Sequence, residues 1–383
     1  MEKTMLGAVV GAAALQLALL ATAGAAQFSY KVTDLGDEPT GSALNDSGQI
    51  VGSTHVNNHR RAFLTGPDGI GINLLPLLSG DLESIALGVN NLGQVTGYSY
   101  DTRNPQPPAH VFVTGSGGSS PQSLGIGTGF DINNLGQVTG ILVNGGMFLS
   151  GVNGQPLKFL GRLPGSTYAL PSAVNDLGQV AGESGFGLGF SDRRAFVSGP
   201  DGGALKELGA PGKGRSASDV NNLGQAVGYA QVNRNHAHAF LSDTNGRLRD
   251  LGTLFPGTSS NALAINEAGV VVGISFRPED DPDGIFADAF VFTAANDMQN
   301  LNDLINPRLN IQLFQADDIN ERGQILALGF AGNEQHTFLL TPITHVPDTG
   351  SAIMLFCCTL IALVLFGTLV RRDAVNSSSN SRM

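Results

Sequence analysis

Tryptophan is absent from this chain of 383 residues, tyrosine occurs only 5 times, and the only 2 cysteines are neighbours, Cys357 and Cys358. A disulfide framework is therefore excluded for the rest of the chain. Lys and Arg number 21 against 32 Asp and Glu, and the net charge of -11 argues against a nucleic-acid partner, which needs a basic stripe. The few aromatic residues leave a thin platform for sugar stacking. The G-x-S-x-G, H-E-x-x-H and Walker motifs are also missing, so common catalytic signatures are lacking.

One phrase recurs along the chain. VNNLGQVTG at residues 89–97 returns as INNLGQVTG at residues 132–140, and seven copies lie 42 to 54 residues apart. Each copy has a glycine three residues after its first asparagine and a phenylalanine in a later apolar run. The asparagines are Asn45, Asn90, Asn133, Asn175, Asn221, Asn266 and Asn320, and the phenylalanines are Phe63, Phe112, Phe148, Phe196, Phe240, Phe290 and Phe338. A period of this size indicates a repeat architecture.

Each copy predicts four short strands. N-x-x-G places Asn first and Gly last in a type I turn, which joins two strands in a tight hairpin. A third strand, such as AFLT, is apolar on successive residues and should be buried on both faces, and a fourth ends in sequences such as LRDLG. With glycine at 52 residues and charged residues at only 14%, we expect an all-β, seven-bladed β-propeller over residues 27–342. The glycine that closes the second strand, such as Gly228, should let an adjacent blade approach closely.

The two ends of the repeat region distinguish a closed ring from its rival, an open β-solenoid. The last copy lacks a fourth strand, whereas a spare one, FSYKVTDLG at residues 28–36, precedes the first copy. If this segment pairs into the last unit as its outer strand, the ring closes and its sheet edges are protected. We therefore expect a propeller closed by an N-terminal strand.

Apolar segments flank the repeats. Residues 1–26 contain a basic residue, an apolar stretch and Ala23-Gly24-Ala25, the pattern of a cleaved signal peptide. Ala352 to Val370 is uncharged and long enough to span a bilayer, and Arg371 and Arg372 should stay in the cytoplasm. We expect a linker at 343–351, a transmembrane helix at 352–370 and a cytoplasmic basic tail at 371–383. The Sec machinery would then export the body across the inner membrane, to the cell surface or the extracellular space.

DVNNLGQAVGY, HAHAFLS and LRDLGTLFPG, within residues 219–257, resemble the HAF repeat of bacterial exported proteins. His238-Ala239-Phe240 keeps the triplet that gives the repeat its name, although only the phenylalanine is present in every copy. The resemblance covers residues 28–341 and implies an exported repeat protein without an established activity.

The C-terminal region has a resemblance of its own. VPDTGS, the apolar segment and two arginines are similar to the PEP-CTERM class of sorting signals in its V-P-D-[ST]-G form. This implies an exosortase-type transpeptidase as a partner and, after processing, loss of the helix. The residues of the motif are Val346, Pro347, Asp348, Thr349, Gly350, Ser351, Arg371 and Arg372.

Candidate binding residues lie in the loops that vary in length. If the strands run outward from the axis, the loops between second and third strands share one face with the loops between units, opposite the short N-x-x-G turns. Variable loops on a rigid scaffold commonly carry recognition. We therefore place a partner site on Arg60, Arg103, Arg193, Arg234 and Arg277, together with the loop 277–284.

Metal ligands are sparse. Glu279, Asp280, Asp281 and Asp283 offer hard oxygen ligands for calcium, with a solvated acidic loop as the competing interpretation. The seven N-x-x-G turns lack the alternating carboxylates of a calcium loop, so turn chemistry explains them better. His110, His238 and His336 occupy one repeat column and are expected to close a strand end or to hydrogen-bond a neighbour. No other cofactor is expected.

These features predict a non-enzymatic, exported propeller that serves as a binding or structural protein of the envelope or matrix. Whether its partner is a surface glycan or a protein stays open. The alternative is a glycan-active hydrolase or lyase, which would need two carboxylates about 5 to 10 Å apart in the axial channel.

Overall fold

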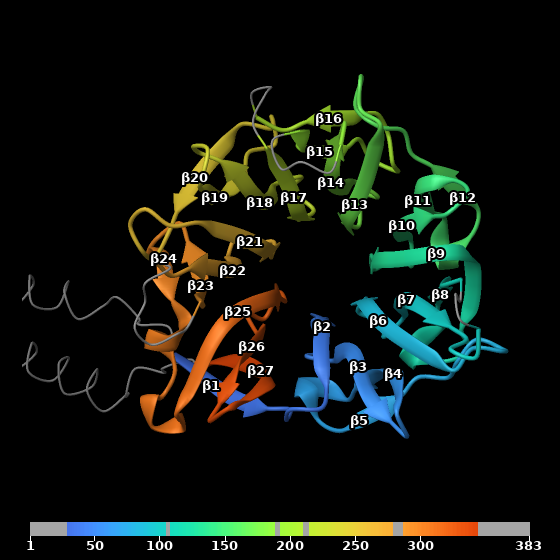
Figure 1. The fold of residues 1–383 in the computed structure, drawn as a ribbon, viewed down its shortest axis with the longest axis horizontal. Helices are drawn as coiled ribbons and strands as arrows, with labels where there is room; N and C mark the ends of the chain where they lie inside the picture. The colour runs from blue at the N-terminus through green and yellow to red at the C-terminus, as the bar shows by residue number, and fades with distance from the viewer. Residues whose placement is uncertain (1–28, 105–107, 188–191, 210–213, 279–285, 344–383) are drawn as a thin grey trace, which may run out of the picture. The chain divides into compact units, whose positions relative to one another are not determined.

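The computed structural model describes residues 29–104, 108–187, 192–209, 214–278 and 286–343. Residues 29–342 make one compact unit of β-strands and short 3-10 helices. Its strands are packed as sheets around a central axis (Figure 1). The 3-10 helices are η1 (Pro67–Gly69), η2 (Ser116–Gly118), η3 (Val152–Gly154), η5 (Leu301–Leu304) and η6 (Pro307–Leu309).

Four of the sheets have four antiparallel strands joined in chain order. The first contains β2 (Thr40–Leu44), β3 (Ile50–Val56), β4 (His59–Thr65) and β5 (Ile72–Leu74). The others contain β13 (Tyr168–Val174), β14 (Val180–Gly185), β15 (Arg194–Ser198) and β16 (Leu205–Glu207); β17 (Arg215–Val220), β18 (Ala226–Gln231), β19 (Ala237–Ser242) and β20 (Leu248–Gly252); and β21 (Ser260–Ile265), β22 (Val271–Phe276), β23 (Ala287–Thr293) and β24 (Asp297–Asn300). In each, the first strand lies nearest the axis (Figure 1).

The second and third repeats share one sheet of seven strands. It contains β6 (Glu83–Val89), β7 (Val95–Tyr100), β8 (His110–Val113), β9 (Gln122–Ile132), β10 (Val138–Leu142), β11 (Gly146–Ser150) and β12 (Leu157–Phe159). The first half of β9 pairs with β8 as an outer strand, and its second half, from Gly127, pairs with β10 as an inner strand. The expectation of seven separate four-stranded blades is therefore wrong. The short connection LGIGTG leaves no loop between these two repeats, so the strand continues from one to the next.

The remaining sheet joins the two ends of the repeat region. Its strand order is β1 (Ser29–Asp34), β27 (Glu334–Ile343), β26 (Ile325–Ala331) and β25 (Ile311–Ile319). The backbone N–H of Leu35 donates to the carbonyl of Thr337 at 2.9 Å, and Tyr30 is buried in the adjoining core cluster. The predicted closure by an N-terminal strand is confirmed, and the open solenoid is excluded. In Figure 1 the blue β1 lies beside the red β27.

The core lies between neighbouring sheets. All seven repeat phenylalanines are buried, none more than 3% exposed. One cluster, for example, packs Val51 and Leu64 of the first sheet against Ala86 and Phe112 of the next. The predicted burial of both faces of the third strand is confirmed, since a sheet between two neighbours has no solvent face.

The glycine of the second strand has a different role from the one expected. A Cβ on Gly228 would lie 2.0 Å from the carbonyl oxygen of Ser216, in the inner strand of the same sheet. The register of that strand shifts between Ala217 and Asp219, and this β-bulge brings the carbonyl close to the glycine. The same contact recurs at Gly52, Gly97, Gly140, Gly182 and Gly273. The constraint comes from a bulge inside the sheet and not from an adjacent blade.

In the part of the chain that the structure describes, no helix is long and apolar enough to cross a membrane. The predicted signal peptide, residues 1–26, lies outside the described residues. So do residues 344–383, which hold nearly all of the linker, the sorting motif, the predicted helix at 352–370 and the basic tail.

Candidate functional site

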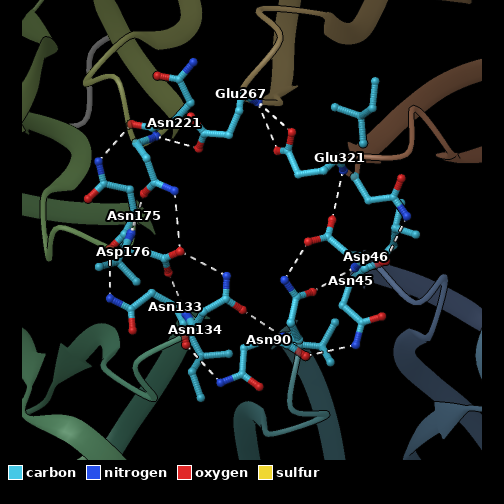
Figure 2. A pocket seen from close by; sticks show the side chains of 18 of the residues that line it. Asn45, Asp46, Asn90, Asn133, Asn134, Asn175, Asp176, Asn221, Glu267 and Glu321 are labelled. Atoms are coloured by element: carbon cyan, nitrogen blue, oxygen red, sulfur yellow. Dashed lines mark hydrogen bonds between the residues drawn. The ribbon is translucent and has the colours of Figure 1, made fainter.

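The seven N-x-x-G turns meet around the axis and bind one another (Figure 2). Within each turn the asparagine Oδ1 accepts hydrogen bonds from backbone N–H groups; for example, the N–H of Gln49 donates to Asn45 at 3.0 Å. The glycine of each turn has a φ angle of 67 to 75°. The asparagine Nδ2 then donates to the carbonyl of the next turn's asparagine at 2.8 to 3.3 Å. These bonds link Asn45, Asn90, Asn133, Asn175, Asn221, Asn266 and Asn320 and return to Asn45. The repeated asparagine is thus the link between units.

A second ring of hydrogen bonds lies beside the first. The residue after each asparagine donates its backbone N–H to the side-chain oxygen of its counterpart in the next turn, at 2.8 to 3.0 Å. The members are Asp46, Asn91, Asn134, Asp176, Asn222, Glu267 and Glu321, and Glu321 returns to Asp46. Sequence reasoning missed this ring, although its signal is visible: all seven copies have a side-chain oxygen at this position.

The two rings surround an axial cavity of about 290 Å³ (Figure 2). Four carboxylates face it, from Asp46, Asp176, Glu267 and Glu321. Burial raises the pKa of Glu321, and the charges of Glu267 and Asp46 raise it further. Each of these carboxylates also accepts a hydrogen bond of the second ring, so each helps to hold two neighbouring turns together. Among the described residues there is no group of three or more acids, histidines or cysteines arranged to hold a metal ion.

Three half-buried aspartates form a second layer. Asp131, Asp219 and Asp318 each accept one backbone N–H from the following residue and one from the neighbouring repeat, at 2.7 to 2.9 Å. Burial raises the pKa of Asp219 to about 7 and that of Asp318 to about 8, and it also raises the pKa of Asp131. Sequence reasoning missed them because the other four copies have Ala or Gly at this position.

Exposed leucines mark the turn face. The third residues of four successive turns, Leu92, Leu135, Leu177 and Leu223, are 50 to 59% exposed. These side chains are not needed for the turn geometry, because the other three copies have Ser47, Ala268 and Arg322 there. We call these four residues the leucine arc.

On the opposite, loop face, two of the predicted binding arginines are held in ion pairs. Arg193 Nη1 lies 3.1 Å from Glu183 and 3.3 Å from the Tyr229 hydroxyl. Arg277 makes two hydrogen bonds, at 3.0 and 3.1 Å, to Asp288, which is fully buried. Their guanidinium groups therefore serve first to satisfy buried or half-buried acids.

The other three predicted arginines are exposed. Arg103 pairs with Asp101 at 2.8 Å and donates to the Gly80 carbonyl. Arg60 lies in the tight β3–β4 hairpin, opposite His55. Arg234, in the β18–β19 loop, lines a cavity. The structure does not gather the five arginines into one site.

That cavity, the Arg234 pocket, has a volume of about 420 Å³ and lies between the β17–β20 and β21–β24 sheets. Its lining combines apolar groups with amides and hydroxyls: Tyr229, Gln231, Arg234, Asn235, His236, Ala237, Ser259, Ser260, Asn261 and Phe276, with Gly214. The Oδ1 atom of Asn261 is buried and has no hydrogen-bond partner. A buried acceptor without a donor lowers stability, and because this oxygen has no solvent-accessible surface, a ligand in the cavity does not reach it in this conformation.

The three repeat histidines hydrogen-bond to nearby aspartates, as predicted. The Nδ1 atoms of His110, His238 and His336 lie 3.2, 3.0 and 2.9 Å from carboxylate oxygens of Asp81, Asp250 and Asp34. The predicted calcium ligands Glu279, Asp280, Asp281 and Asp283 lie outside the described residues.

Known proteins resemble this chain mainly in fold. Residues 212–358 match a family described as "Protein of unknown function (DUF3466)". No curated protein matches the sequence.

Solved structures with a similar fold include the β-propeller domain of the Trilobed protease from Pyrococcus furiosus (TM-score 0.52, 8% identity, 84% of this chain and 97% of that chain). YCF48 from Cyanidioschyzon merolae has a TM-score of 0.51 and 10% identity over 82% and 99% of the two chains. An oligogalacturonate lyase from Vibrio parahaemolyticus has a TM-score of 0.50 and 12% identity over 84% and 94%. At these identities the likeness shows a β-propeller fold alone.

Proposed function

We propose that this chain is an exported, non-enzymatic β-propeller of the cell envelope or extracellular matrix that binds a partner through its loop face. The observation that carries the proposal is the contrast between the two faces. On one face, the polar groups of the turns bind one another in two closed rings of hydrogen bonds. The other face has loops of unequal length, exposed arginines and a cavity of about 420 Å³ lined by apolar and polar side chains.

In this proposal the propeller has seven blades, with the seven-stranded sheet counted as two blades that share β9. The seven-membered rings support this count, because each repeat contributes one turn to each ring. The proposal also includes export by a signal peptide and a helix at 352–370 in the inner membrane. An exosortase-type transpeptidase would sort the protein at residues 346–351. Their support is the resemblance to HAF-repeat proteins and PEP-CTERM signals.

Two measurements test the proposal. Cells and medium are fractionated, and the mature C-terminus is mapped by mass spectrometry; a cut within 346–351 is expected, and an intact helix in the membrane fraction contradicts sorting. Separately, purified protein is titrated onto isolated envelope and matrix material. Saturable binding is expected, and its absence contradicts the binding role.

A second candidate, a glycan-active enzyme, is favoured by one observation. Glu267 and Glu321 are neighbours in the axial cavity, and the raised pKa of Glu321 suits a general acid. Replacing Glu321 with Gln would abolish polysaccharide cleavage if this candidate is correct. Under the binding proposal, the unsubstituted protein cleaves no polysaccharide.

A further inference from the structure

We infer that the Arg234 pocket binds a carboxylate-bearing sugar, a hexuronate unit of an acidic polysaccharide. The inference rests on the proposed binding function and names the chemical class of the partner. Two features of the pocket support it: an exposed cation in its lining, and a combination of apolar surface with amides and hydroxyls.

The cation is Arg234. It is exposed, and no carboxylate among the described residues lies within ion-pair distance of it. In a chain with a net charge of -11, such a guanidinium is a local site for an anion. A carboxylate is the natural partner, because the planar guanidinium donates two parallel hydrogen bonds to it.

The polar groups of the lining include the amides of Gln231 and of Asn261 on β21, and the Ser259 hydroxyl. Amides and hydroxyls pair with hydroxyl groups of a ligand, which inorganic anions without protons and fatty-acid tails do not supply. Sugar hydroxyls match these groups because each can both donate and accept a hydrogen bond.

The apolar surface comes from Tyr229, Ala237 and Phe276. A pyranose ring presents apolar C–H groups on its faces, and two aromatic residues suffice for one ring although the chain as a whole has few. The volume of about 420 Å³ is within the range of small-ligand sites. The pocket thus has room for a sugar unit and contacts for each part of a hexuronate.

A peptide with a free C-terminal carboxylate is the competing ligand. An extended peptide binds best along an unpaired strand edge. Three of the strands at the pocket, β18, β19 and β22, are paired on both sides within their sheets, and the free edge of the fourth, β21, faces the axis. The side-chain amides and hydroxyls of the pocket therefore favour the sugar.

Calorimetric titration of the full-length protein tests this. The probes are trigalacturonate, a glucuronate trisaccharide, neutral galactotriose and a short peptide with a free C-terminal carboxylate. At least one uronate should bind, and galactotriose should bind at least about tenfold more weakly, since it lacks the carboxylate. Arg234→Gln should weaken uronate binding about tenfold or more, and added salt should weaken it as well. Arg308→Gln, at an exposed arginine of η6 outside the pocket, is the matched control and should bind like the unsubstituted protein.

Equal binding of galactotriose, binding of the peptide alone, or an unaffected Arg234→Gln variant would each overturn the inference. Saturable binding to envelope material without any uronate binding would overturn it and leave the proposed function standing. Failure of both assays would refute both. Asn261→Ala adds a second readout, because it should weaken uronates and galactotriose alike.

Discussion

Asn320 Nδ2 donates a hydrogen bond of 2.9 Å to the carbonyl oxygen of Asn45, 275 residues away in the chain. This bond completes the ring that runs through all seven turns. The repeated asparagine therefore has a structural role, and the turns of this face hold the repeat units together.

Replacing Asn320 with Ala should destabilise the fold. The change removes the link to Asn45 and two bonds to backbone N–H groups of its own turn, and it leaves the buried Asn45 carbonyl with one donor, the Gly48 N–H, in place of two. We expect a loss of about 1–3 kcal/mol in the free energy of unfolding, measured by urea denaturation. Asn73→Ala, at an exposed residue of β5, is the control and should stay within about 0.5 kcal/mol. Equal losses in both variants would contradict a structural role for the ring.

Replacing Phe240 with Ala should cost about 3–5 kcal/mol, because the ring is 1% exposed between two sheets. Phe159→Ala is the matched control, since that ring is 53% exposed in β12. Thermal and chemical unfolding would measure both. A cost below about 0.5 kcal/mol for Phe240→Ala would contradict its place in the core.

Gly228→Ala should destabilise the protein by about 1–3 kcal/mol, because the new methyl group would lie 2.0 Å from the Ser216 carbonyl oxygen unless the bulge shifts. Gly161→Ala is the control, since no atom lies within 4 Å of its Cβ position. Identical melting temperatures for Gly228→Ala and the unsubstituted protein would show that the bulge yields at little cost.

Stability should fall as the pH rises from about 5 to about 8. In the folded protein burial raises the pKa of Asp219 to about 7 and of Asp318 to about 8, whereas both should ionise near 4 when unfolded. The folded state therefore holds more protons in this window, and each group lowers the free energy of unfolding by on the order of 1 kcal/mol per pH unit between its unfolded and its folded pKa. The stabilisation from the two protonated carboxyl groups is complete below their pKa in the unfolded state. It is lost as the pH rises past their pKa in the folded state.

The Asp219→Asn/Asp318→Asn double variant isolates this effect. The asparagine side chains have one acceptor oxygen fewer than the aspartates, so the variant should be less stable at every pH. The quantity to compare is therefore the slope of the unfolding free energy against pH. A flatter slope than in the unsubstituted protein is expected, and an unchanged slope would contradict the assignment.

The repeat alone predicted much of the fold. N-x-x-G turns, doubly buried third strands and the displaced N-terminal strand follow from local patterns, and Tyr30 lies in the core as closure requires. The continuity of β9 did not follow, because pairing depends on how neighbouring repeats meet. The layer of Asp131, Asp219 and Asp318 could not be predicted from the repeat pattern, because only three of the seven copies have a carboxylate at this position.

The site was harder to predict than the fold. Arg234 was identified from its loop, but Asn261 and Phe276 belong to the next repeat and meet it only where two sheets adjoin. Arg193 and Arg277 resembled Arg234 in the sequence, and only their acidic partners in space distinguish them.

The central claim is that recognition lies on the loop face and not on the turn face. The most direct test compares the affinity of two variants for envelope material: Arg234→Gln on the loop face, and Leu177→Ser in the leucine arc, whose side chain is 50% exposed. We predict that Arg234→Gln loses about tenfold or more in affinity while Leu177→Ser binds like the unsubstituted protein. Loss of binding in Leu177→Ser with full binding in Arg234→Gln would contradict the account.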